Sequence, residues 1–187
     1  MAKTATQVVT GVVRLSYLNV FKPRAAAEGQ DEKYSACLLI PKTDKETVRA
    51  IRAACEAARL GSAALYGGKV PEKLKLPIHD GDGEMPNGGE YGPECKGMYV
   101  INASSKQQPG LVDKRLNPIL DSTELYSGAW GRVDVNFYAY NVNGNRGIAC
   151  GLNNIQKIRD DEPLGGRARA QDVFGVVEDD DDDDLGL

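Results

Sequence analysis

The chain has 187 residues, of which 41% are hydrophobic and 27% charged, enough apolar material for one domain with a buried core. Its formal net charge of -4 hides an asymmetry, because seven of the 27 acidic residues lie between Glu178 and Asp184 and none of the 23 lysines and arginines do. Residues 1–177 therefore carry a formal charge of +3, and a basic body with an acidic end is typical of nucleic-acid partners. No long apolar run indicates a secretory signal or a membrane span, so we expect a cytoplasmic protein with no membrane partner.

The first part of the chain predicts two strands joined by a loop. Residues 8–21 are rich in β-branched and aromatic side chains, which is typical of one strand or of a bent pair. Pro23, Gly29 and the polar residues around them interrupt this pattern and predict a hairpin loop. The run YSACLLI, residues 34–40, predicts the next strand, which ends at Pro41.

One main helix is predicted, over about residues 44–60. Apolar residues recur there at helical spacing, and Gly61 marks the end. Thr43 and Glu46 fit a capping box, in which each side chain accepts a hydrogen bond from the backbone N–H of the other residue. The opposite face is more typical of a solvated surface than of a phosphate site; its cations are Lys45, Arg49, Arg52 and Arg59.

The remainder predicts a long loop and three further strands. Residues 61–97 are rich in glycine and proline without clear periodicity, and a loop of that length is often functional. A strand is predicted over 97–105, and two long strands flank Asn143 and Gly144, a dipeptide that favours a tight hairpin.

About five strands with one helix favour a mainly β fold, an OB-fold-like Greek-key barrel with long inserted loops. An open α+β sheet is the alternative. We expect the domain to span residues 1–160, followed by a connector over 161–177 and a disordered acidic tail over 178–187.

The strand GRVDVNFYAYN, residues 131–141, alternates between two kinds of side chain. Val133, Val135 and Phe137 share one face, typical of a core, and the other face mixes a cation, amides and two tyrosines. Interleaved cations and rings suit a groove for single-stranded nucleic acid, because the backbone supplies charge and every base has a π-face. The residues that we expect to contact DNA are Lys22, Arg24, Lys33, Tyr34, Lys106, Lys114, Arg115, Arg132, Tyr138 and Tyr140.

Signals for an enzyme are thin. The segment HDGDGE, residues 79–84, could hold a divalent cation, but its spacing fails the EF-hand pattern and an acidic turn is the simpler interpretation. The single histidine, His79, has no nucleophile signature to support it, and no phosphate-binding loop is found. The four cysteines are too far apart to predict a zinc site. We therefore expect no catalytic residue, no metal and no cofactor.

The acidic end predicts a binding segment. Its carboxylates resemble a short run of phosphates, so the tail could mimic DNA within its own chain and dock on partner proteins. Pure solubilisation is the alternative. The residues concerned are Glu178, Asp179, Asp180, Asp181, Asp182, Asp183, Asp184, Leu185 and Leu187.

Several segments in collinear order resemble a phage family of single-stranded-DNA-binding proteins, long filed as an uncharacterised phage domain. They are KYSACLLIPK (33–42), PIHDGDGE (77–84), MYVINASS (98–105), VNFYAYN (135–141), GIACGLNNIQKIRDDEPLGGR (147–167) and the acidic end. The resemblance implies an OB-fold barrel related to the T7-type phage proteins. It also implies a role in phage replication or recombination in the cytoplasm of an infected bacterium, without catalysis.

We therefore expect a protein that coats single-stranded DNA with little sequence preference and recruits phage or host replication proteins through its tail. A homodimer is possible. T7-type tails end in an aromatic residue, whereas this one ends in Leu187, which leaves the tail's partner pocket open. Two rivals remain: a metal-dependent nuclease or hydrolase that uses residues 79–84, and an acidic-tailed interaction or virion protein without affinity for DNA.

Overall fold

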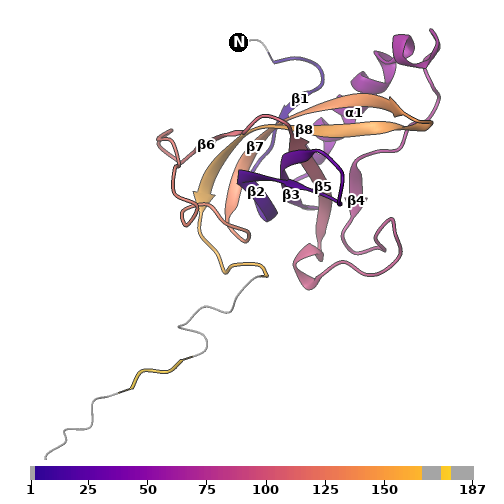
Figure 1. The fold of residues 1–187 in the computed structure, drawn as a ribbon. Coiled ribbons are helices and arrows are strands. Elements are labelled where there is room, and N and C mark those ends of the chain that lie inside the picture. Colours follow the sequence, from indigo (N-terminus) through magenta and orange to yellow (C-terminus); the bar gives the residue numbers. More distant parts are fainter. Residues whose placement is uncertain (1–2, 166–173, 178–187) are drawn as a thin grey trace, which may run out of the picture.

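The computed structural model describes residues 3–165 and 174–177, and eight strands and one α-helix lie within them (Figure 1). The strands are β1 (Gln7–Val9), β2 (Val13–Ala25), β3 (Glu32–Pro41), β4 (Ile78–Asp80), β5 (Met98–Ser105), β6 (Gly110–Val112), β7 (Trp130–Val142) and β8 (Asn145–Arg159). The helices are α1 (Lys45–Leu60) and two 3-10 turns, η1 (Ala63–Tyr66) and η2 (Pro93–Cys95).

Five of the strands close into a ring in the order β2, β3, β5, β8 and β7, with β7 pairing again with β2. All of these pairings are antiparallel except β5–β8, which is parallel at Ala103↔Cys150 and Ser104↔Gly151. The predicted OB-fold-like barrel is confirmed. β1 adds to the outer edge of β7, β4 adds to β5, and β6 adds to β8.

The core fills the barrel and continues beneath α1. Phe137, Leu38 and Ile101 are at most 1% exposed inside the ring, which explains the apolar alternation of the barrel strands. The helix packs against β7 and β1 through a buried stripe that includes Ile51 and Cys55.

The predicted capping box is wrong. Asp44, not Thr43, is the N-cap: its carboxylate accepts hydrogen bonds from the backbone N–H of Thr47 at 3.1 Å and from the Thr47 hydroxyl at 2.6 Å. A carboxylate at the cap also faces the positive end of the helix dipole, which favours Asp44 over a neutral threonine.

The predicted strand over 8–21 is a bent pair, β1 and β2, and β2 continues beyond Pro23 to Ala25. The long loop over 61–97 contains η1, which contacts β7; β4, which pairs with β5; and η2, which contacts β5. A second small cluster of Cys37, Leu39, Cys95 and Val100 packs beneath it. The Asn143–Gly144 turn is confirmed, with φ values of 51° and 80° that suit a tight hairpin.

The packed body extends beyond the predicted boundary at residue 160. The indole N–H of Trp130 donates to Asp161 at 2.8 Å, and the backbone N–H of Leu164 donates to the carbonyl of Ser127 at 2.8 Å. The acidic tail, residues 178–187, lies outside the described residues. Among the helices that the structure does describe, none is long and apolar enough to cross a membrane.

Candidate nucleic-acid interface

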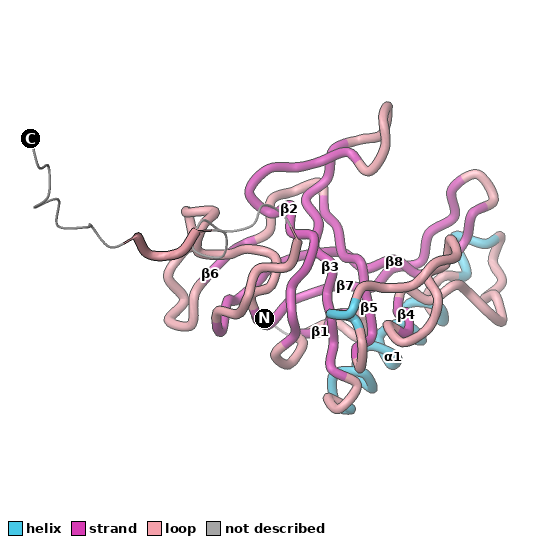
Figure 2. Tube along the Cα trace, turned by 90° about the horizontal axis from the view of Figure 1, so that it is seen from below, coloured by secondary structure: helices cyan, strands magenta, loops and turns pink. Residues whose placement is uncertain are grey.

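A groove of about 1060 Å³ opens between two hairpins of the barrel. The β2–β3 loop forms one wall and the tip of the β7–β8 hairpin forms the other, while β2, β3 and β5 line its floor. These two loops are the ones that join the first to the second and the fourth to the fifth strand of the ring. In OB folds the corresponding loops and the adjoining sheet face bind oligonucleotides. Figure 2 shows both hairpins projecting from the body, the β2–β3 hairpin at the top and the β7–β8 hairpin at the upper right.

Two cations meet at the wall formed by the β2–β3 hairpin. Arg24 and Lys33 are directly paired across the antiparallel ladder, and both line the groove and are exposed. Like charges opposite one another destabilise a sheet unless an anion lies between them. No ion pair within residues 3–165 and 174–177 involves either side chain. The pair is therefore a candidate site for an anionic chain.

Tyr17 stands in the same groove in an unusual conformation. Its φ of 45° lies in the left-handed region, and its side chain is 75% exposed. It occupies a β-bulge, because the register between β2 and β3 shifts between Ser16 and Asn19. The backbone N–H of Leu18 donates to the hydroxyl of Ser127 at 3.0 Å, which helps to hold the strained turn. A bulge that turns a ring outward in strained geometry is typical of a binding site.

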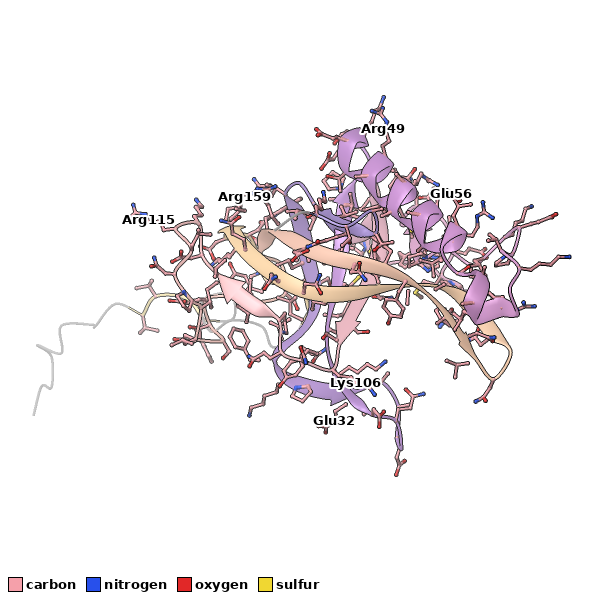
Figure 3. The ribbon with its side chains drawn as sticks, turned by 90° about the horizontal axis from the view of Figure 1, so that it is seen from above. Glu32, Arg49, Glu56, Lys106, Arg115 and Arg159 are labelled. Atoms are coloured by element: carbon pink, nitrogen blue, oxygen red, sulfur yellow. The ribbon has the colours of Figure 1, made fainter. Side chains whose placement is uncertain are left out.

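Lys106 reaches the groove's rim from the end of β5. Its ammonium forms an exposed ion pair with Asp31 of the β2–β3 loop at 3.6 Å. Figure 3 shows Lys106 and Glu32 close together at this end of the molecule. Lys22 is exposed on β2, within the second register shift between Asn19 and Arg24, and does not line the groove.

Tyr34 has the opposite phase to Lys33 on β3. It alternates with Ala36 and Leu38, which point into the barrel, and it is half-buried. The groove is lined instead by Lys33 and Ser35. Tyr34 therefore does not line the groove, although Lys33 beside it does.

The predicted phase of β7 is confirmed, since Val133, Val135 and Phe137 are at most 1% exposed while Tyr138 is 44% exposed. Neither tyrosine of the outward row lines the groove. Tyr138 packs over Gly151 beside the end of α1, and Tyr140 packs over Gly147. Glycines at these positions leave a flat surface that each ring covers. Because the rings lie outside the groove, their contact with DNA stays a prediction.

The remaining predicted cations lie elsewhere. Arg132 donates to the carbonyl of Thr10 at 3.1 Å on the β1 side of β7. Lys114 and Arg115 belong to the loop after β6, and Figure 3 shows Arg115 at a different end of the molecule from Lys106. These three side chains do not join Arg24 and Lys33 in one groove.

The acidic loop over 79–84 is held by a lysine. The ammonium of Lys42 lies 2.5 Å from Asp80 and 2.7 Å from Asp82, and it also lies over the ring of Tyr99. The hydrogen bonds that the Lys42 ammonium donates, with a smaller contribution from its positive charge, hold the pKa of both carboxyls below their usual range. Within the described ranges, no group of three or more histidine, cysteine, aspartate or glutamate side chains is arranged to bind a metal.

The thiols are also poorly suited to nucleophilic chemistry. All four cysteines are buried and free. Burial raises the pKa of Cys37 to about 12 and that of Cys55 to about 11. Both are therefore neutral thiols near pH 7, whereas the thiolate is the reactive form.

The sequence did not identify Tyr17 as a candidate binding residue. Its neighbours read as a continuous strand, and a bulge between Ser16 and Asn19 has no local sequence signal. A second cavity of about 330 Å³ lies on the other side of Tyr17, where Leu164 and Gly165 contribute to its lining. The connector thus leaves the body beside the groove.

Comparison with known proteins adds to this geometry. The family described as Enterobacter phage Enc34, ssDNA-binding protein, matches residues 6–185. A curated relative, putative protein p50 of Acyrthosiphon pisum secondary endosymbiont phage 1, is 28% identical over 164 residues, which cover 82% of this chain and 84% of the relative.

Two solved structures share the fold. The single-stranded DNA-binding protein from bacteriophage Enc34, in complex with ssDNA, has a TM-score of 0.72 and 26% identity, covering 88% of this chain and 97% of that one. A crystal structure of gp2.5, a single-stranded DNA-binding protein encoded by bacteriophage T7, has a TM-score of 0.58 and 14% identity, covering 92% and 98%, a likeness of fold. The match covers nearly the whole chain, and the chain therefore belongs to the phage Enc34 ssDNA-binding protein family.

Proposed function

We propose that this protein binds single-stranded DNA in the groove between the β2–β3 loop and the β7–β8 hairpin. The observation that carries the proposal is the meeting of Arg24 and Lys33 with the exposed ring of Tyr17 in one groove. The cations neutralise successive phosphates, and the ring stacks on a base. Family membership and the ssDNA complex of the Enc34 protein support the same ligand.

Binding is sequence-tolerant in this proposal. A stacked ring accepts any base, because every base has a π-face, and phosphate contacts carry no sequence information. Asn19 and Ser35 are polar residues on the floor of the groove, and the Asn19 side-chain amide already donates to the carbonyl of Tyr17 and to the hydroxyl of Ser35, each at 3.3 Å. The protein coats exposed strands during phage replication or recombination in the infected host, and it acts without catalysis.

We further propose that the acidic run, residues 178–184, competes with DNA for this groove and recruits replication proteins when DNA displaces it. The connector supports this, because Gly165 and Tyr17 line one cavity. Twelve residues lie between Gly165 and Glu178, so the chain can reach up to about 45 Å from one to the other. Tethering at that range gives an effective concentration of order millimolar.

Fluorescence anisotropy with a labelled single-stranded oligonucleotide tests the groove. The double substitution Arg24→Ala with Lys33→Ala should weaken binding and reduce the slope of log affinity against log salt by about 1.4, at roughly 0.7 per lost phosphate contact. The matched control, Lys114→Ala with Arg115→Ala, removes the same charge at another end of the molecule and should change the slope little.

Two results would overturn the proposal. An equal loss in the control would show that binding depends on overall charge and not on this groove. Absence of binding to single strands at low salt would favour the rival interpretation, an acidic-tailed interaction or virion protein.

A further inference from the structure

Part of the outer edge of β7 has no strand beside it. β1 pairs with β7 only as far as Gln7↔Asn136, with one further bond from the backbone N–H of Phe137 to the carbonyl of Thr6 at 2.9 Å. From residue 138 onward, no described strand other than β8 pairs with β7. Exposed strand edges are binding templates unless something covers them.

A groove of about 520 Å³ runs along this bare edge, within the size range of ligand sites. Its floor is the stretch of β7 from Asn136 to Ala139, and its far wall is the end of α1 with η1. The lining is mostly small or apolar, including Ala57, Ala64 and Leu65. An extended apolar peptide could therefore find both backbone partners and side-chain contacts here.

The chain itself carries a peptide of that kind. Residues 174–177 are Phe-Gly-Val-Val. Phenylalanine and valine favour strands, and Phe174 is 73%, Val176 96% and Val177 89% exposed. Three large apolar side chains so close together rarely remain in water unless they have a partner.

The length of the intervening chain indicates whether residues 174–177 dock in the groove of their own chain or in that of a second copy. Eight residues lie between Gly165 and Phe174, so the chain can reach about 30 Å from one to the other when fully extended. Leu164 is bonded to Ser127 near the start of β7, and Ala139 lies nine residues beyond Trp130, also about 30 Å along a strand. Figure 1 shows the chain near residue 165 on the opposite side of the barrel from η1. A segment of the same chain would need its entire reach, whereas one from a second copy is not restricted.

We propose that residues 174–177 of one copy add as a short strand to the β7 edge of a second copy, between Tyr138 and η1. Donor and acceptor are different surfaces, so the contact is head to tail and each copy can donate and accept at once. The contact needs no DNA. That it would join neighbouring copies along a coated strand rests on the proposed function.

Charge also supports this occupant. The run 178–184 follows the docked segment directly and can extend about 24 Å. The tip of the β7–β8 hairpin, where Val142 and Asn145 line the DNA groove, lies only about 10 Å along β7 from Ala139. The carboxylates would therefore meet the Arg24 and Lys33 cations of the receiving copy.

Sedimentation velocity on the full chain without DNA tests the contact. The average mass of the wild type should rise with concentration. Phe174→Asp destroys the donor, and Ala64→Glu obstructs the acceptor at an exposed position; each should weaken association by roughly 30-fold or more, the effect of losing a central anchor. Ala53→Glu, the same change on the exposed side of α1 away from the groove, should associate like the wild type.

Mixing the two defective variants gives the sharpest result. The Ala64→Glu chain keeps its donor and the Phe174→Asp chain keeps its acceptor, so an equimolar mixture should form dimers and nothing larger. A wild type that stays monomeric at all concentrations, variants that associate normally, or a mixture that stays monomeric would each overturn the proposal. Both variants should still bind a short oligonucleotide, so loss of the contact is distinguishable from failure of the DNA groove.

Discussion

The ammonium of Lys106 lies 3.6 Å from the carboxylate of Asp31, so an exposed ion pair joins the end of β5 to the β2–β3 loop at the rim of the proposed DNA groove. Asp31 places a negative charge among the cations that would contact phosphates. Its ion pair with Lys106 also engages an ammonium that could otherwise bind a phosphate. Exposed ion pairs of this kind contribute little to stability. The pair therefore affects binding more than folding.

Asp31→Asn should tighten binding to single-stranded DNA and steepen its salt dependence by about 0.7, because Lys106 becomes free to contact one more phosphate. Anisotropy titrations at several salt concentrations measure both. Glu72→Gln removes one exposed negative charge outside the groove and serves as the control. Equal tightening in the control would indicate a general charge effect.

Tyr17→Ala should weaken binding by about 1–3 kcal/mol, the loss expected for one stacked base. Tyr17→Gly should weaken it similarly without loss of stability, since glycine relieves a left-handed residue of roughly 1–2 kcal/mol of strain and loses about 0.5–1 kcal/mol to chain entropy. Urea denaturation and anisotropy measure the two effects separately.

Tyr138→Ala and Tyr140→Ala provide the comparison for Tyr17, because both rings lie outside the groove. If these two variants lose more affinity for DNA than Tyr17→Ala while remaining folded, DNA follows the outer face of β7 instead.

Phe137→Ala should cost about 3–5 kcal/mol of unfolding free energy, because the ring is 1% exposed and its removal leaves a cavity in the barrel. Tyr138→Ala, one residue away on the exposed face, should cost much less. Urea denaturation of the two variants measures the difference. Similar losses would contradict the assigned phase of β7.

Lys42→Met should change the response to acid. In the wild type Asp80 and Asp82 have lowered pKa values, so their ion pairs stabilise the fold above the usual carboxyl range, and that contribution is lost as the pH falls through the folded-state values. The variant lacks the ammonium and should lose less stability on acidification. Urea midpoints measured between neutral and acid pH test this, and identical profiles would contradict it.

Labelled DNA incubated with magnesium or manganese should remain intact, because Lys42 already occupies the carboxylates of Asp80 and Asp82. Cleavage that disappears on Asp80→Asn and Asp82→Asn substitution would establish the nuclease instead.

Deletion of residues 178–187 changes the formal charge from -4 to +3. It should tighten binding to single-stranded DNA, most strongly at low salt, because the competing carboxylates are lost. A chain with Asp179–Asp184 replaced by asparagine keeps the length and should behave like the deletion. If neither variant binds more tightly than the wild type at low salt, the run does not occupy the groove.

Local patterns in the sequence were sufficient for much of the fold. The alternation around Phe137 identified the two faces of β7, and Asn143–Gly144 identified its hairpin, because each depends only on residues adjacent in the chain. Helical spacing located α1 to within a residue, although the cap is Asp44 and not Thr43, since neighbouring polar residues compete for the same amides. The acidic run is visible in the composition alone.

Only the tertiary structure decided which residues share a site. Tyr17 reaches the groove because a bulge breaks the register of β2 against β3, and that bulge is bonded to Ser127, 109 positions along the chain. Lys42 neutralises Asp80 because β3 and β4 both pair with β5. Arg115 was grouped with Lys106 from its closeness in the sequence, but a different strand carries it to another end of the barrel. Periodicity indicates which way a side chain faces along its own strand, whereas the closure of the barrel determines which distant side chains it meets.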